Sequence, residues 1–138
     1  MIGARIEARY TLALAPERVK PKHVALLALL RSGVPASQLE IATRMQVAPS
    51  LVVTLADQLE HLGALARERD PHDRRRQRLA LTPAGEDLLD RCGVVVAALD
   101  AELIRLLDAD AAALEPGIAR LAVGLGLPLG TGTSPPTP

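Results

Sequence analysis

An arginine-rich segment in the middle of the chain, residues 67–82, restricts the possible fold more than any other feature. It holds six arginines and three acidic residues, whereas the whole chain balances sixteen basic and sixteen acidic side chains. Asp70-Pro71 and the polar residues after it predict a turn. Alternating residues flank that turn, namely Leu65, Arg67 and Arg69 before it and Leu79 and Leu81 after it. The pattern predicts two short strands joined by a charged tip, which is a β-hairpin.

Two interpretations of this hairpin are open. Arginines on a protruding hairpin suit a narrow, strongly negative groove such as the DNA minor groove. A solvated hairpin whose charges only keep its edge soluble would have the same composition. The neutral total charge does not decide between them, because the local field matters at a binding face. From residue 67 to residue 78, six arginines minus three acids leave a local charge of +3.

Composition narrows the function further. The chain has no Phe, no Trp and a single Tyr, so a binder of single-stranded nucleic acid, which needs aromatic stacking platforms, is nearly excluded. His23, His61 and His72 lack a metal-ligand spacing, and we see no nucleophile motif or phosphate loop, so we expect neither an enzyme nor a cofactor. Cys92 lies in an apolar helical run and is expected to be a buried, inert thiol. Without a membrane-length apolar run or a leader-like start, we expect a cytoplasmic protein with no membrane partner.

The 138 residues fit one domain made mainly of helices. Helices are expected over residues 3–14, 21–31, 37–45, 49–62, 83–107 and 108–125, with a disordered tail over residues 126–138. Ser37 and Glu40 have the spacing of a capping box, and Gly33 and Gly63 stand where helices end. One buried stripe is expected on the fourth helix, formed by Val52, Leu55, Leu59 and Leu62.

A short helix, a tight turn, a longer helix and a hairpin follow one another here, which is the order of a winged helix-turn-helix. The hairpin sequence from Asp70 to Gly85 resembles the signature of the MarR (multiple antibiotic resistance regulator) transcription factors. That signature is Asp-Pro-x-Asp-x-Arg, three residues, an apolar residue, one residue, Leu-Thr, two residues and Gly. Residues 38–42 and 57–63 are similar to the family's third helix and to the end of its recognition helix. The resemblance covers about residues 20–89 in detail.

This resemblance implies a mainly α fold with a small β-hairpin wing. The winged helix-turn-helix would occupy residues 20–83, and helical dimerisation regions would flank it over residues 1–19 and 84–125. The family implies a homodimer that reads an inverted repeat in double-stranded DNA, often as a repressor released by small anionic or aromatic effectors. An alternative is a family-like dimer with degenerate DNA reading that works as a protein-interaction or ligand-binding module, which the apolar recognition helix favours.

The resemblance also gives roles to residues of the wing. Arg75 is similar to the family arginine that enters the minor groove, and Arg74 is the second candidate at the tip. Asp73 is expected to hold the arginines in place by a charge-assisted bond rather than to meet DNA.

Direct reading of bases would fall to the recognition helix. Its hydrogen-bonding candidates are Ser50, Thr54 and Gln58, of which Gln58 suits adenine best, and Val53 can touch a thymine methyl. Such a helix predicts modest, AT-leaning direct reading, supplemented by phosphate contacts and DNA shape.

Two further sets of residues are weaker candidates. Ordinary surface polarity would explain the first set equally well, and surface charge or a core-edge position explains each residue of the second set better than a ligand contact does. Phosphate contacts are expected from Ser37, Gln38 and Arg44. Effector contacts are expected from Arg9, Tyr10 and His23, with Arg5 and Lys22 nearby.

Overall fold

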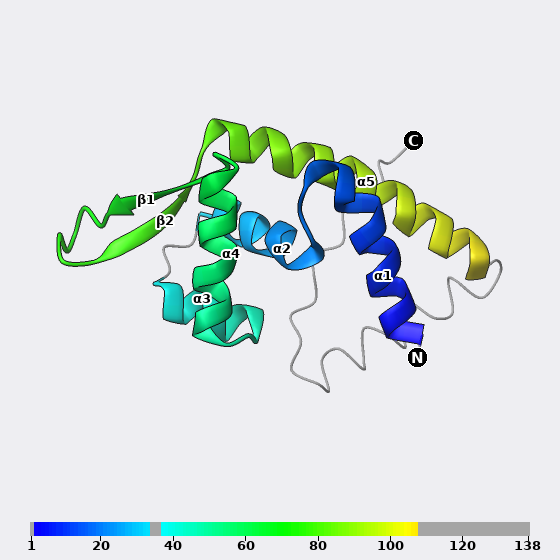
Figure 1. Ribbon diagram of the computed structural model, residues 1–138, viewed down its shortest axis with the longest axis horizontal. Coiled ribbons are helices and arrows are strands. Elements are labelled where there is room, and N and C mark those ends of the chain that lie inside the picture. Colours follow the sequence, from blue (N-terminus) through cyan, green and yellow to red (C-terminus); the bar gives the residue numbers. More distant parts are fainter. Residues whose placement is uncertain (1, 34–36, 108–138) are drawn as a thin grey trace, which may run out of the picture. The chain divides into compact units, whose positions relative to one another are not determined.

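The computed structural model describes residues 2–33 and 37–107 (Figure 1). Along the chain come α1 (Ile2–Leu14), the short 3₁₀ helix η1 (Ala15–Glu17), α2 (Pro21–Arg31), α3 (Gln38–Met45), α4 (Pro49–His61), β1 (Leu65–Arg69), β2 (Gln77–Leu81) and α5 (Pro83–Leu107). The expected helices up to residue 107 and the expected hairpin are confirmed. The sixth helix and the tail expected from the sequence lie outside the described residues. Within the described part, no helix is long and apolar enough to cross a membrane.

The chain divides into two compact units, residues 1–99 and 100–138. The first contains every element up to most of α5. Of the second, the structure describes the last turns of α5, where Ile104 and Leu106 are exposed.

Local chemistry explains where the helices begin and end. Ser37 Oγ accepts from the Glu40 backbone N–H at 3.2 Å, and the Ser37 N–H donates to Glu40 Oε2 at 2.8 Å, so the expected capping box is formed. Pro49 stands at the start of α4, where its missing N–H costs no hydrogen bond. Gly63 ends α4 with a φ of +72°, a conformation that glycine adopts at little cost.

Aliphatic side chains from all the α-helices of the first unit build its core. The stripe expected on α4 is confirmed for Val52, Leu55 and Leu59, which are buried, while Leu62 is half-buried. The remaining fully buried side chains with large volumes are Leu14, Leu26, Leu27, Ile41 and Cys92. Each large aliphatic group contributes about 1.5–3 kcal/mol by leaving water, so α2, α3 and α4 are held as one body.

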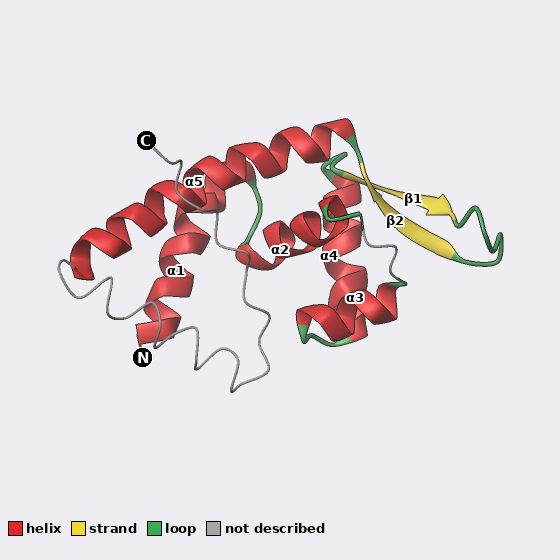
Figure 2. Ribbon diagram, turned by 180° about the vertical axis from the view of Figure 1, so that it is seen from behind, coloured by secondary structure: helices red, strands yellow, loops and turns green. Residues whose placement is uncertain are grey.

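The hairpin is a two-stranded antiparallel sheet whose register runs from Leu65 opposite Leu81 to Arg69 opposite Gln77. Leu65 and Leu79 are buried in the core, whereas the far end of both strands is exposed. As a result the hairpin extends away from the helices in both ribbon views (Figures 1 and 2).

A tight joint connects the hairpin base, the end of α4 and the start of α5. The Thr82 hydroxyl donates to the Gly63 carbonyl at 2.6 Å and accepts from the Gly85 N–H at 3.0 Å, and the Thr82 N–H donates to the Ala64 carbonyl at 3.2 Å. A Cβ at Gly85 would lie 2.0 Å from the Ala64 oxygen, so this position requires glycine. The Leu-Thr-x-x-Gly part of the sequence signature is therefore the joint that fixes the wing.

Candidate nucleic-acid interface

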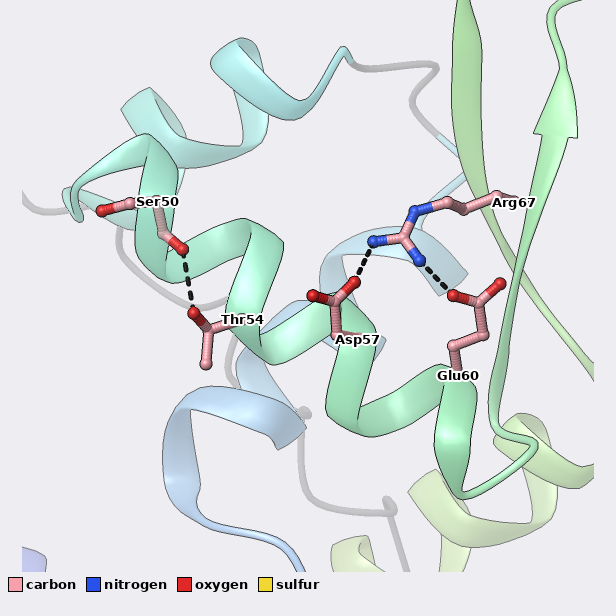
Figure 3. A network of polar contacts seen from close by, with 5 residues as sticks. All are labelled: Ser50, Thr54, Asp57, Glu60 and Arg67. Carbon is pink, nitrogen blue, oxygen red and sulfur yellow. Dashed lines mark hydrogen bonds and ion pairs between the residues drawn. The ribbon is translucent and has the colours of Figure 1, made fainter.

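The exposed side of α4 carries all four residues expected to read bases. Ser50, Val53, Thr54 and Gln58 are exposed. The Thr54 hydroxyl donates to the Ser50 carbonyl at 3.1 Å (Figure 3), so its lone pairs are what remain for a partner. Val53 is 41% exposed and adds an apolar spot to a row that is otherwise polar.

The wing tip is shaped by its two aspartates. Asp70 Oδ1 accepts from the His72 backbone N–H at 2.8 Å, and this bond lowers the pKa of the Asp70 carboxyl. Asp73 Oδ1 accepts from the Arg75 N–H at 3.0 Å, and Asp73 Oδ2 lies 3.6 Å from Nε of Arg76. Asp73 thus orders the Arg75 backbone, while its ion pair is with the next arginine along the chain.

The six arginines of the hairpin divide into two groups. Arg67, Arg76 and Arg78 form ion pairs, the last with Glu68 directly opposite it across the strands at 3.0 Å. Within residues 2–33 and 37–107, the guanidinium groups of Arg69, Arg74 and Arg75 have no ion-pair partner. The charge that the tip offers to another molecule therefore resides in these three.

Arg67 connects the wing to the recognition helix. Its guanidinium lies between two carboxylates of α4 and donates one N–H to Asp57 and another to Glu60 (Figure 3). The Arg67 side chain is 22% exposed, and the hydrogen bond to Asp57, followed by the charge of Glu60, raises its pKa. Sequence reasoning missed this clamp, although two acids three residues apart on the exposed side of α4 were a usable signal.

The candidates on α3 lie at its first and last turns. Ser37 and Arg44 are exposed and Gln38 is half-buried. The Ser37 oxygen already accepts one bond in the capping box, so its O–H is what it can still donate to a phosphate oxygen.

His23 and Gln58, expected to have separate roles, are hydrogen-bonded to each other. His23 is 6% exposed, its Nδ1 accepts from the Lys20 N–H at 3.0 Å, and its Nε2 lies 2.6 Å from Gln58 Oε1. Reading adenine with two bonds requires the amide oxygen of Gln58, and His23 already engages one of the two lone pairs of that oxygen. His23 therefore holds the orientation of the Gln58 amide, and the adenine contact expected from the sequence stays a prediction.

A cavity of about 580 Å³ lies between the end of α1, α2 and the exposed side of α4. Its polar lining residues include Arg18, Lys20, His23, Asp57, Gln58 and His61. Of the effector contacts expected from the sequence, only His23 is among the lining residues; Arg9 and Tyr10 are not. The sequence missed Arg18, Lys20 and His61, because nothing in the spacing of these residues indicates that η1, α2 and α4 meet.

A helix-turn-helix with an exposed second helix, followed by an arginine-tipped hairpin, defines a winged-helix protein. A sequence model of the MarR family matches residues 19–76. The structure is similar to that of the transcriptional repressor CouR bound to a 23-mer DNA duplex, with 32% identity, a TM-score of 0.78 and coverage of 88% of this chain and 87% of that one. The chain belongs to the MarR family.

Curated relatives agree with this assignment. A putative transcriptional regulatory protein for the hcr operon of Thauera aromatica is 34% identical over 106 residues, and the repressor MdtR of Bacillus subtilis strain 168 is 36% identical over 74. These matches cover 76% and 54% of this chain, but 64% and 48% of the two relatives. The chain thus spans about half to two thirds of the length of these relatives.

Proposed function

We propose that the chain acts as a homodimeric, sequence-specific regulator of transcription, most simply a repressor, that binds an inverted repeat in double-stranded DNA. The observation that carries this proposal is the combination of an exposed reading row on α4 with Arg74 and Arg75 unpaired at the tip of a fixed hairpin. Each protomer would insert α4 into the major groove and the hairpin tip into the neighbouring minor groove. As a regulator of promoters it would act in the cytoplasm.

Apolar side chains on the flanking helices support the dimer. Leu12 on α1 is 74% exposed and Val94 on α5 is 72% exposed, and single chains gain by covering such residues. The cavity beside α4 would receive a small anionic effector, because Arg18, Lys20 and His61 line it.

The test is a fluorescence titration with labelled duplex DNA from upstream of the protein's own gene, repeated at several salt concentrations. We expect tight, salt-sensitive binding that a duplex of scrambled sequence does not compete away. Arg75→Ala should weaken it, whereas Arg5→Ala, which removes an exposed arginine of α1, should not. Equally weak binding to every duplex would contradict the proposal and support the protein-interaction or ligand-binding module.

A further inference from the structure

The contacts of His23 fix which nitrogen carries its hydrogen. A backbone N–H can only donate, so Nδ1, which lies 3.0 Å from the Lys20 nitrogen, must hold a lone pair. The ring hydrogen is therefore on Nε2, which faces the Gln58 side chain at 2.6 Å. Gln58 must meet that hydrogen with its amide oxygen, since the opposite orientation would place two donors against each other.

Through this bond the buried His23 fixes the orientation of the exposed Gln58 side chain. His23 is buried, and an unsatisfied donor there disfavours rotation of the Gln58 amide by on the order of tenfold. Gln58 itself is exposed and follows Ser50 and Thr54 on α4 at intervals of four residues, which places all three along one side of the helix. The amide oxygen of Gln58 is thus turned toward His23, and the NH₂ group, which has two hydrogens to donate, is the freer hydrogen-bonding group of Gln58 on that side of α4.

An amide restricted in this way reads a different base edge from a free one. A free glutamine recognises adenine by donating to N7 and accepting from the N6 amino group. An NH₂ group alone matches a pair of neighbouring acceptors, and in the major groove guanine offers that pair as O6 and N7. Adenine and thymine each offer a single acceptor there.

We propose that His23 is a positioning residue that holds the amide oxygen of Gln58 toward α2 and so presents its NH₂ group, and that Gln58 thereby favours guanine at one position in each half-site. This inference rests on the proposed function, because it requires α4 to enter the major groove. It also assigns to a residue of the cavity wall a part in choosing the DNA sequence.

The experiment is selection of binding sites from a random duplex library, with sequencing, by the full chain and its variants. The wild-type chain should enrich a motif in which one position of each half-site prefers guanine by about 5-fold or more. Gln58→Glu keeps an acceptor for His23 Nε2 but has no donor, so the guanine preference should be replaced by one for cytosine, whose amino group a carboxylate accepts.

Two substitutions of His23 distinguish an effect on the orientation of Gln58 from an effect on the stability of the fold. His23→Asn keeps an acceptor near the position of Nδ1 for the Lys20 N–H but removes the donor to Gln58, so adenine should rise to at least equal guanine at that position. His23→Gln keeps a donor near the position of Nε2 and removes the acceptor, so it should lower thermal stability while leaving the guanine preference.

The outcomes are distinguishable. Loss of the guanine preference in His23→Asn but not in His23→Gln supports the proposal. An unchanged motif in His23→Asn, or a motif that Gln58→Glu weakens uniformly at all positions as a phosphate contact would, overturns it. If His23→Asn does not fold, the guanine-to-cytosine change in Gln58→Glu decides alone. If the wild-type chain enriches no motif, the proposed function itself has failed.

Discussion

Replacing a glycine by alanine in the same helix should have opposite effects at two positions. Inside a helix, alanine is favoured over glycine by about 1 kcal/mol, because glycine loses more backbone freedom on folding. At Gly93 in α5, an added Cβ would meet no atom of the described residues within 4 Å beyond its own helix backbone, so Gly93→Ala should raise the free energy of unfolding by up to about 1 kcal/mol. Gly85 lies in the first turn of α5, and there steric contact decides the sign.

A methyl group at Gly85 would lie 2.0 Å from the Ala64 oxygen and 2.7 Å from Cδ1 of Leu81. Carbon and oxygen normally approach to about 3.3 Å, so the backbone must separate by more than an ångström. That movement breaks the three hydrogen bonds of Thr82 at the joint, each worth about 1 kcal/mol. Strain adds about 1–3 kcal/mol to this loss, and the better helix propensity of alanine offsets about 1 kcal/mol of it. We therefore expect Gly85→Ala to lower the free energy of unfolding by about 3–5 kcal/mol.

Thermal and urea unfolding followed by circular dichroism would measure both variants. Gly85→Ala should lower Tm by more than about 10 °C, and Gly93→Ala should leave it equal or higher. Measurements at two protein concentrations would separate folding from self-association. A Gly85→Ala chain as stable as the wild type would refute the argument that backbone contact at the joint requires glycine.

Four further experiments test the remaining arguments. Arg67→Ala should lower the free energy of unfolding by about 1–2 kcal/mol and weaken DNA binding, because it leaves two carboxylates of α4 unpaired. The stability of Arg67→Lys should lie between those of Arg67→Ala and the wild type. Equal unfolding midpoints for the three chains would contradict the role given to this ion pair. Arg75→Ala should reduce the slope of log affinity against log salt by about one unit, and an unchanged slope would mean that Arg75 does not meet a phosphate. Ser37→Ala should cost about 1 kcal/mol in urea unfolding, which Ser37→Asp should restore. Burial raises the pKa of the Cys92 thiol in the folded chain above the ordinary thiol pKa of 9.0. Stability should therefore fall as the pH rises above 9.0, because the unfolded chain loses this proton first. A thiol reagent that reacts with the native chain as fast as with the unfolded chain would contradict the burial of Cys92.

The elements that depend on local sequence were predicted well. The capping box of Ser37, the end of α4 at Gly63 and the hairpin turn after Asp70 are each decided by residues a few positions apart, and all three form as expected. The buried side of α4 was predictable for the same reason, since a helical period places Val52 and Leu59 on one side.

The contacts that combine distant elements could not be predicted in the same way. Arg67 and Asp57 lie on different elements, and their pairing depends on the angle at which the hairpin leaves α4. His23 and Gln58 are 35 positions apart, and they meet because α2 and α4 pack against a shared aliphatic core. The sequence predicted His23 in an effector site and Gln58 in a base-reading site, whereas the fold makes the two residues neighbours.

Two separate attachments of the hairpin base have a thermodynamic consequence for association. Arg67 holds β1 to α4, and Thr82 holds the end of β2 to the carbonyl of Gly63, so bending at the base would have to break both. Immobilising a flexible arm of this length on a partner would cost backbone entropy at every residue. In this molecule that loss has already occurred during folding, and the remaining loss falls mainly on the long side chains of the tip, at roughly 0.5–1.5 kcal/mol each.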